Sequence, residues 1–146
     1  LANEFDEQGR TALSLAIKAE REDLADLLLT LSADPDVADD VSQHAGKLTG
    51  ASPTLHAVLG DLPGTVLKLA KRKADLNLKN AFGMTPVMLA CLAGDVDVVE
   101  LLLEHGADPE LRDAAGWTPL MYCAYGGHLK CAQVVVRYGV SLKTKD

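Results

Sequence analysis

A spacing of 33 residues recurs along this chain and constrains its fold more than any other feature of the sequence. The segments that start at Thr85 and at Thr118 align without a gap, and the same register places Gly94 on Gly127. Ser52 lies a further 33 residues before Thr85. A fixed period of this length is typical of solenoids, in which each repeat buries its apolar face only against its neighbours.

Each unit carries the signals of two short helices followed by a turn. Thr followed by Pro, as at Thr85, starts a helix because the hydroxyl caps the first turn and Pro fits the first helical position. Gly94 separates the first apolar helix from the second. Gly106 and Gly139 suit the left-handed residue that ends a helix, so we predict that the second helices stop there. The polar stretch 108–117 is too short for a helix and predicts a turn or hairpin.

Four such units account for nearly all of residues 1–146, which we expect to form one repeat domain. Their approximate bounds are 6–38, 39–79, 80–112 and 113–146. Ser52 lies 41 residues after Thr11, eight more than the period, and alignment places the extra residues at about 42–49, in a hairpin tip. This polar insertion predicts an exposed finger loop, which is either a partner-specific contact or an extension without a function.

A sequence motif recurs at the start of the units. In the first unit it consists of Asp6, Gly9, Thr11, Leu13 and Ala16. In the fourth unit it consists of Asp113, Gly116, Thr118, Pro119 and Leu120. This pattern resembles the ankyrin repeat, whose signature is D-x-x-G-x-T-P-L-H-x-A followed by G-A-D. The resemblance covers nearly the whole chain and implies an all-α repeat solenoid of stacked helix-turn-helix units joined by β-hairpin or turn fingers.

The histidine of that signature is absent from every unit. The residues that stand in its place are Ser14, Leu55, Met88 and Met121. We therefore expect the local hydrogen bonds of this histidine to be missing. The hydrophobic period is intact, so the predicted fold does not change.

Composition and spacing argue against several classes of function. The net charge of -7 disfavours nucleic-acid binding and docking on an anionic membrane. No apolar run reaches the roughly 18 to 20 residues that a spanning helix needs, so we expect no membrane insertion. The His and Cys residues lack metal-ligand spacing, and the chain has neither a phosphate-binding Gly loop nor a Gly-flanked nucleophile. We predict that the chain is not an enzyme and has no catalytic residue, metal ion or cofactor.

The three cysteines indicate the cellular compartment of the protein. Cys91, Cys123 and Cys131 form an odd set in apolar helical stretches, without a disulfide framework. We therefore expect a reducing, cytoplasmic location.

Met121 and Val136 stand where a terminal repeat is usually more polar, so we expect a piece of a longer chain. A complete four-repeat domain with an apolar end is the alternative.

Stacking in register predicts which residues face a partner, because in this family partners usually bind the concave side. The residue before each first helix is, in order, Arg10, Ala51, Met84 and Trp117. A second column, late in the first helix, is Lys18, Leu59, Leu92 and Tyr125. Adding Phe82 at a hairpin tip, we predict a partner-binding site that consists of Arg10, Lys18, Phe82, Met84, Leu92, Trp117 and Tyr125. Packing of these apolar side chains against neighbouring hairpins or in the core is the alternative.

These features favour a non-catalytic protein-interaction module, a scaffold or adaptor inside a larger protein. Its protein or peptide partner would bring an apolar anchor to Trp117 and Tyr125 and acidic groups to Arg10 and Lys18. The alternative is a regulatory or targeting domain of an enzyme or channel, which packs against its own polypeptide. The resemblance also implies that Asn77, in a hairpin, is a candidate for hydroxylation.

Overall fold

The computed structural model describes residues 2–39 and 50–143, and within these residues the chain forms eight α-helices and no β-strand. They are α1 (Ala12–Lys18), α2 (Glu22–Thr30), α3 (Pro53–Leu59), α4 (Pro63–Lys71), α5 (Pro86–Ala93), α6 (Val96–Glu104), α7 (Pro119–Gly126) and α8 (Leu129–Lys143). The insertion predicted at 42–49 lies outside the described residues.

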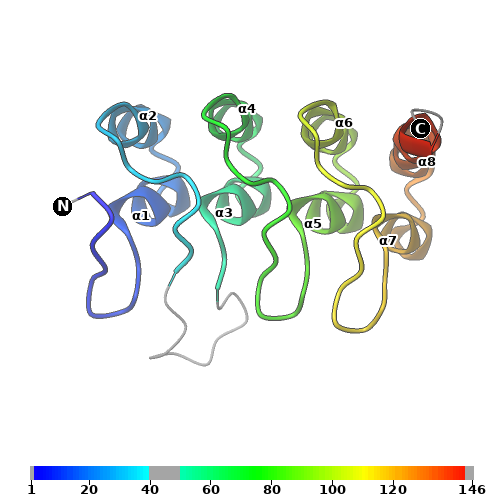
Figure 1. Cartoon of the computed structure of the whole chain (residues 1–146), viewed down its shortest axis with the longest axis horizontal. Coiled ribbons are helices and arrows are strands. Elements are labelled where there is room, and N and C mark those ends of the chain that lie inside the picture. The colour runs from blue at the N-terminus through cyan, green and yellow to red at the C-terminus, as the bar shows by residue number, and fades with distance from the viewer. Residues whose placement is uncertain (1, 40–49, 144–146) are drawn as a thin grey trace.

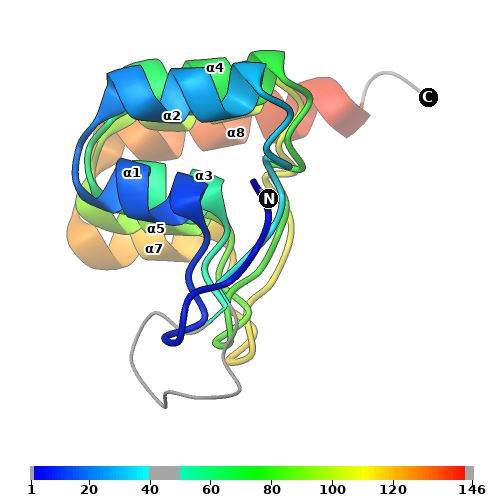
Figure 2. The same ribbon diagram turned by 90° about the vertical axis from the view of Figure 1, so that its left-hand side faces the viewer.

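The helices form two parallel rows along the long axis of the molecule (Figure 1). The inner row is α1, α3, α5 and α7, and the outer row is α2, α4, α6 and α8. Each helix packs against its sequence partner and against the next helix of its own row. The turns between successive helix pairs project as fingers from one edge, where they superimpose in the end-on view (Figure 2). The predicted all-α repeat solenoid is confirmed, with fingers that are turns in the part of the chain described here.

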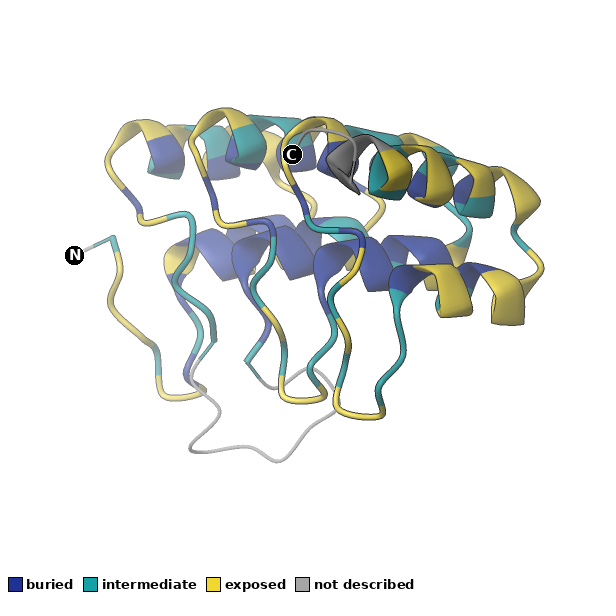
Figure 3. Cartoon of the chain, turned by 45° about the vertical axis from the view of Figure 1, so that its right-hand side comes forward, coloured by how far each residue is buried: buried dark blue, intermediate teal, exposed yellow. Residues whose placement is uncertain are grey.

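One apolar core runs through all four helix pairs, from Leu13 in α1 to Val135 in α8. Leu55, Val87 and Leu102 are fully buried between neighbouring pairs. Burying one such side chain contributes roughly 1.5 to 3 kcal/mol. The inner row is therefore the most buried part of the structure, and α7 at its end is more exposed (Figure 3).

Every inner helix starts at a hydroxyl cap, as the sequence predicts. Thr11 Oγ1 accepts a hydrogen bond from the backbone N–H of Ser14 at 3.1 Å, and Thr85 Oγ1 accepts one from Met88 at 3.4 Å. The expectation that local hydrogen bonds are missing where the signature His is replaced is wrong in two units. Ser14 Oγ accepts from the Thr11 N–H at 3.1 Å, and Met88 Sδ accepts from the Thr85 N–H at 3.4 Å. A hydroxyl or a thioether can therefore replace the imidazole as the acceptor.

The outer helices end differently in the third and fourth units. Gly106, with φ of 95°, follows α6 in the left-handed conformation, as predicted. Gly139 does not end a helix, because α8 continues through it to Lys143. In the third unit Asp108 Oδ1 accepts a hydrogen bond from a backbone N–H two residues on, at 2.8 Å, which turns the chain. The fourth unit has Ser141 at that position, so this carboxylate turn is missing and the helix extends.

Lys73 and Gly106, which are equivalent residues of successive units, allow the free-energy cost of the left-handed backbone conformation to be measured. Lys73 has φ of 60° at the position that Gly106 occupies one unit later. We expect Lys73→Gly to raise the free energy of unfolding by about 1 kcal/mol, since this conformation costs an L-residue about that much. Gly106→Ala should lower the free energy of unfolding by a similar amount. Beyond the adjacent residues no atom lies within 4 Å of the added Cβ, so the effect comes from the backbone conformation alone. Urea denaturation measures both effects, and unchanged stability of Lys73→Gly would contradict the argument.

Candidate protein-binding site

In the first, third and fourth fingers a side-chain oxygen at the base accepts backbone N–H groups and fixes the turn. Asp113 Oδ1 accepts a hydrogen bond from the backbone N–H of Trp117 at 2.8 Å. Asn80 Oδ1 accepts the equivalent bond from Met84 at 3.0 Å, and a second one from Phe82 at 2.9 Å. Such turns hold the backbone without a β-ladder. The fingers of the third and fourth units therefore present their side chains from a fixed backbone.

The fourth finger and α7 together form an aromatic cluster. The Trp117 ring lies 5.1 Å from the Tyr122 ring and 5.6 Å from the Tyr125 ring, measured between centroids, and both pairs are inclined rather than stacked face to face. Such inclined pairs contribute about 0.5 to 1.5 kcal/mol beyond area burial. Trp117 is half-buried, whereas 75% of Tyr125 is exposed. The two predicted residues thus lie in contact, with Tyr125 facing solvent.

Tyr122, which is half-buried, anchors this cluster to the finger. Its hydroxyl donates a hydrogen bond to Asp113 Oδ2, while the other carboxylate oxygen holds the Trp117 N–H. Burial and the neighbouring Asp113 carboxylate raise the pKa of Tyr122 to about 12. The bond from Tyr122 lowers the pKa of Asp113 below its usual value. One ionised carboxylate therefore ties the turn, Trp117 and α7 together at neutral pH.

The remaining apolar candidates lie beside this cluster, on the third finger and on α5. Phe82 is 53% exposed and Leu92 is 41% exposed, whereas Met84 is half-buried. The carbonyl of Phe82 accepts a hydrogen bond from the Ala114 N–H of the next finger at 3.1 Å. Gly83 permits this approach, because a Cβ there would lie 2.7 Å from that nitrogen and φ is 75°. The third and fourth fingers thus pack closely together.

The basic candidates are paired within the first two units. Arg10 donates two hydrogen bonds to Asp6 Oδ2, at 2.6 and 2.8 Å. Lys18 Nζ lies 3.0 Å from Asp39 Oδ2, which also lies 2.9 Å from Nε2 of the buried His56. Burial opposes ionisation of Asp39, but hydrogen bonds, from His56 first and also from Lys18, outweigh it and lower its pKa to about 2. These carboxylates already balance the positive charges of Arg10 and Lys18.

Asn77 belongs to a hydrogen-bonded ladder along the bases of the fingers. Its Oδ1 accepts from the backbone N–H of Asp108 in the next unit at 2.8 Å. Asn3 Oδ1 accepts the equivalent bond from Asp34, also at 2.8 Å. The half-buried Asn77 amide thus joins two units. Its hydroxylation stays a prediction.

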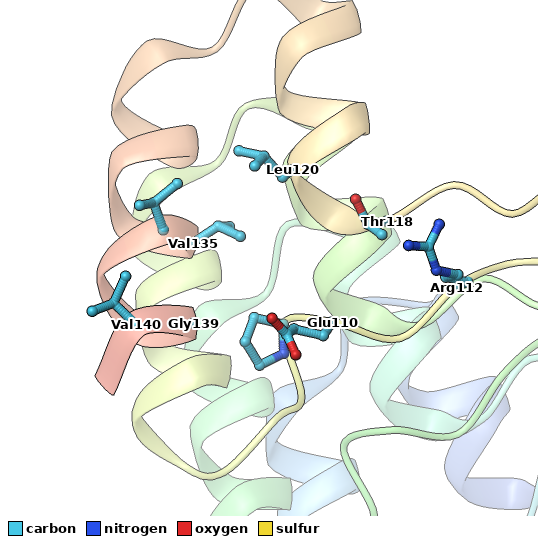
Figure 4. Close-up of a pocket in the computed structure, with 9 residues that line it drawn as sticks. Glu110, Arg112, Thr118, Leu120, Val135, Gly139 and Val140 are labelled. Atoms are coloured by element: carbon cyan, nitrogen blue, oxygen red, sulfur yellow. The ribbon is translucent and has the colours of Figure 1, made fainter. Parts of the chain in front are cut away.

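An apolar face is open at the fourth helix pair. A hollow of about 460 Å³ lies between α7 and α8, where Leu120 and Val140 line it (Figure 4). Leu120 is 39% exposed, whereas Val87, its equivalent one unit earlier, is fully buried by the next pair. Val136 is 47% exposed, and its equivalent Leu103 only 5%. The hollow therefore corresponds to the surface on which, elsewhere in this solenoid, the following pair stacks.

The three cysteine thiols lie in the apolar core. The thiols are fully buried, and burial raises the pKa of each of them, which keeps them protonated; they are Cys91, Cys123 and Cys131. No group of three or more His, Cys, Asp or Glu side chains in the described residues could hold a metal ion. None of the described helices is both long enough and apolar enough to cross a membrane.

Two features of the inner surface were not part of the predicted site. Leu59, at the end of α3, is 46% exposed and extends the row that contains Leu92 and Tyr125. Asp61 and Asp95 lie in successive inter-helix turns, and the Asp95 carboxyl raises the pKa of Asp61. The column that contains Leu59 was visible in the sequence, but the effect of Asp95 on Asp61 depends on how the turns stack.

Comparisons with known proteins identify the family. A model of three ankyrin repeats matches residues 55–146, and a model of the single ankyrin repeat matches residues 8–40. The chain belongs to the ankyrin-repeat family, whose members are generally protein-interaction modules and typically not enzymes. It is similar to "Neurogenic locus notch homolog protein 1" of Xenopus tropicalis, with 37% identity, and of Mus musculus and Homo sapiens, with 36% each, over 91 residues. The match covers 62% of this chain and about 3% of the length of each relative.

The pairing of Asp39 predicts a defined loss of stability in acid. Its pKa is about 2 in the folded chain, against an ordinary value of 3.8, so its contribution is present above about pH 4 and is lost as the pH falls towards 2. We expect Asp39→Asn to lower the free energy of unfolding by about 2 kcal/mol at pH 7 and to flatten its decline between pH 4 and 2. Chemical denaturation across this range measures the effect. Asp97→Asn, on the exposed face of α6, serves as the control, and equal pH profiles for the two variants would contradict the assignment.

Proposed function

We propose that this chain is a non-catalytic scaffold or adaptor module that binds a protein or peptide on its concave side, between the fingers and the inner helices. The observation that carries the proposal is the aromatic cluster of Trp117 and Tyr125. An aromatic residue that is 75% exposed, on a helix whose neighbouring finger is fixed by hydrogen bonds, resembles the preorganised anchors of protein interfaces. The burial of the free thiols supports a reducing, cytoplasmic setting.

The proposed contact surface extends from the fourth unit towards the first. Phe82, Met84 and Leu92 provide apolar area beside the aromatic cluster. Arg10 and Lys18 lie at the opposite end, where Asp6 and Asp39 neutralise them. We therefore assign most of the binding free energy to the apolar end, with the basic residues contributing to orientation.

Removal of the cluster tests this proposal. We expect Trp117→Ala combined with Tyr125→Ala to weaken partner binding at least tenfold, because truncating a central aromatic anchor typically costs more than 2 kcal/mol. Partners captured on the wild-type chain are identified, produced in pure form and titrated against both chains by calorimetry. Trp117 is the only tryptophan in the sequence, so its fluorescence reports contact directly in the wild type.

A matched control keeps this result specific. Leu27→Ala combined with Leu31→Ala removes two exposed apolar side chains, 51% and 62% exposed, from the region of α2, and should leave the affinity unchanged. Both double variants are first compared with the wild type by circular dichroism. Equal partner affinity for the wild type and the aromatic variant would remove the proposed site.

The open face at α7 and α8 favours a second candidate function. It supports a regulatory or targeting domain that packs against the rest of its own polypeptide, as part of a longer chain. Val136, 47% exposed on this face, would then lie in an internal contact.

A charge at this position tests the second candidate. We expect Val136→Asp to change the stability of the isolated chain by less than about 1 kcal/mol, since the side chain is half-exposed there. In the full-length protein the same change should raise amide exchange throughout α7 and α8, because the contact would be broken. Equal exchange of these helices in the isolated chain and in the full-length protein would exclude the second candidate.

A further inference from the structure

A row of exposed apolar side chains follows the ends of the inner helices. Leu59 on α3, Leu92 on α5 and Tyr125 on α7 occupy equivalent positions in successive units, with exposed fractions of 46%, 41% and 75%. In the first unit this position is Lys18, so the row begins at the second unit. In the described residues no element covers these three side chains. They form one unpartnered face, which we call the inner apolar row.

The residues next to this row leave room for another chain. The position that follows each of them is small and exposed in every unit; it is occupied by Ala19, Gly60, Ala93 and Gly126. Side chains of this size let a partner backbone approach the helices closely. At Gly126 the ring of His128 already fills this space, because it would lie 2.5 Å from an added Cβ, so a partner backbone can approach closely only at Gly60 and Ala93.

Carboxylates border the inner apolar row on the side of the inter-helix turns. Asp61 and Asp95 lie in successive turns, two and three residues beyond Leu59 and Leu92. Hydrogen bonding and charge repulsion from the Asp95 carboxyl raise the pKa of Asp61. Glu20 lies in the preceding turn. No lysine or arginine of residues 2–39 and 50–140 forms an ion pair with any of these three acids.

Several acids elsewhere on the molecule are paired. Arg10 is paired with Asp6, Arg21 with Asp23, and Lys68 with Asp26. The overall charge is -7, so the acids beside the apolar row add to a field that already attracts cations. A peptide that complements this surface would carry an apolar side chain followed closely in its sequence by a positively charged one.

We propose that the inner apolar row binds a cationic peptide segment of a partner protein, which places apolar side chains on Leu59, Leu92 and Tyr125 and a Lys or Arg between Asp61 and Asp95. The occupant is inferred from charge complementarity. This inference rests on the proposed function, because it concerns the same concave side. It specifies the class of partner and adds Leu59, Asp61 and Asp95 to the contact residues.

The stacking distance of the helices sets the spacing of the anchors. Packed helices lie about 8 to 10 Å apart, so adjacent members of the row are separated by about one such step. A segment in the polyproline II conformation spans this distance with residues i and i+3, which share one face of its three-residue turn, and an α-helix spans it with i and i+7. The cationic residue should lie next to an anchor, because both acids lie beside the row.

A peptide selection on the whole chain tests the proposal before any natural partner has been identified. The immobilised chain is exposed to a phage-displayed library of random 16-residue peptides. We expect enriched peptides to carry a net positive charge and apolar residues at one of these two spacings. A synthetic copy of an enriched peptide is then titrated by calorimetry, against a copy in which Glu replaces Lys and Arg. The copy with Glu should bind at least tenfold more weakly.

Charge-removing variants locate the contact. Asp61→Asn combined with Asp95→Asn should weaken binding of the cationic peptide about tenfold and reduce its salt dependence. Both substitutions suit the fold, because Asn tolerates the φ of 53° at position 61 and can replace Asp95 as the cap of α6. The control, Asp97→Asn combined with Glu104→Gln, removes the same charge from the outer helix α6 and should leave the affinity unchanged.

The outcomes separate this inference from the proposed function. If the loss of Trp117 and Tyr125 weakens binding but the Asp61 and Asp95 variant does not, the interaction site stands and the cationic partner is wrong. Enrichment of neutral or acidic peptides, or of none, also overturns the inference. If neither double variant changes binding of an enriched peptide, the peptide binds elsewhere and both proposals fall.

Discussion

Each helix pair of this chain is held by the burial of its apolar face against the next pair. Val87 is fully buried because a following pair covers it, whereas Leu120 at the equivalent position is 39% exposed. The hydrophobic free energy is thus gained between units, and no helix pair has a complete core of its own. Since every unit stacks in the same register, equivalent residues become neighbours, and rows of side chains arise that no single unit contains.

The fingers depend on a second kind of interaction. In the first, third and fourth fingers one side-chain oxygen at the base accepts backbone N–H groups, so the turn is fixed without a β-ladder. In the fourth finger the Asp113 carboxylate also accepts the Tyr122 hydroxyl and thereby connects the finger to α7. The stacked helices and these turns together hold Trp117 against Tyr125. A surface held in this way loses little conformational entropy when a partner binds.

Charge is distributed unevenly over this scaffold, and the pairing could not be read from the sequence alone. Arg10 and Lys18 looked available for an acidic partner, but Asp6 and Asp39 neutralise them. Asp61 and Asp95 were not among the predicted contact residues, and the effect of the Asp95 carboxyl, which raises the pKa of Asp61, depends on how their turns stack. The electrostatic character of the inner surface is therefore acidic beside an apolar row.

The sequence by itself determined the period, the helix starts at Thr11, Ser52, Thr85 and Thr118, and hence the solenoid, because caps and periodicity are local signals. The alignment of the units also predicted that Trp117 and Tyr125 lie on the same side of the stacked units. The end of α8 was mispredicted at Gly139, because a glycine permits a helix to stop but the missing Asp turn decides that it continues. Only the tertiary structure decided which charges are paired and which apolar positions stay exposed, since both depend on contacts between residues of different units.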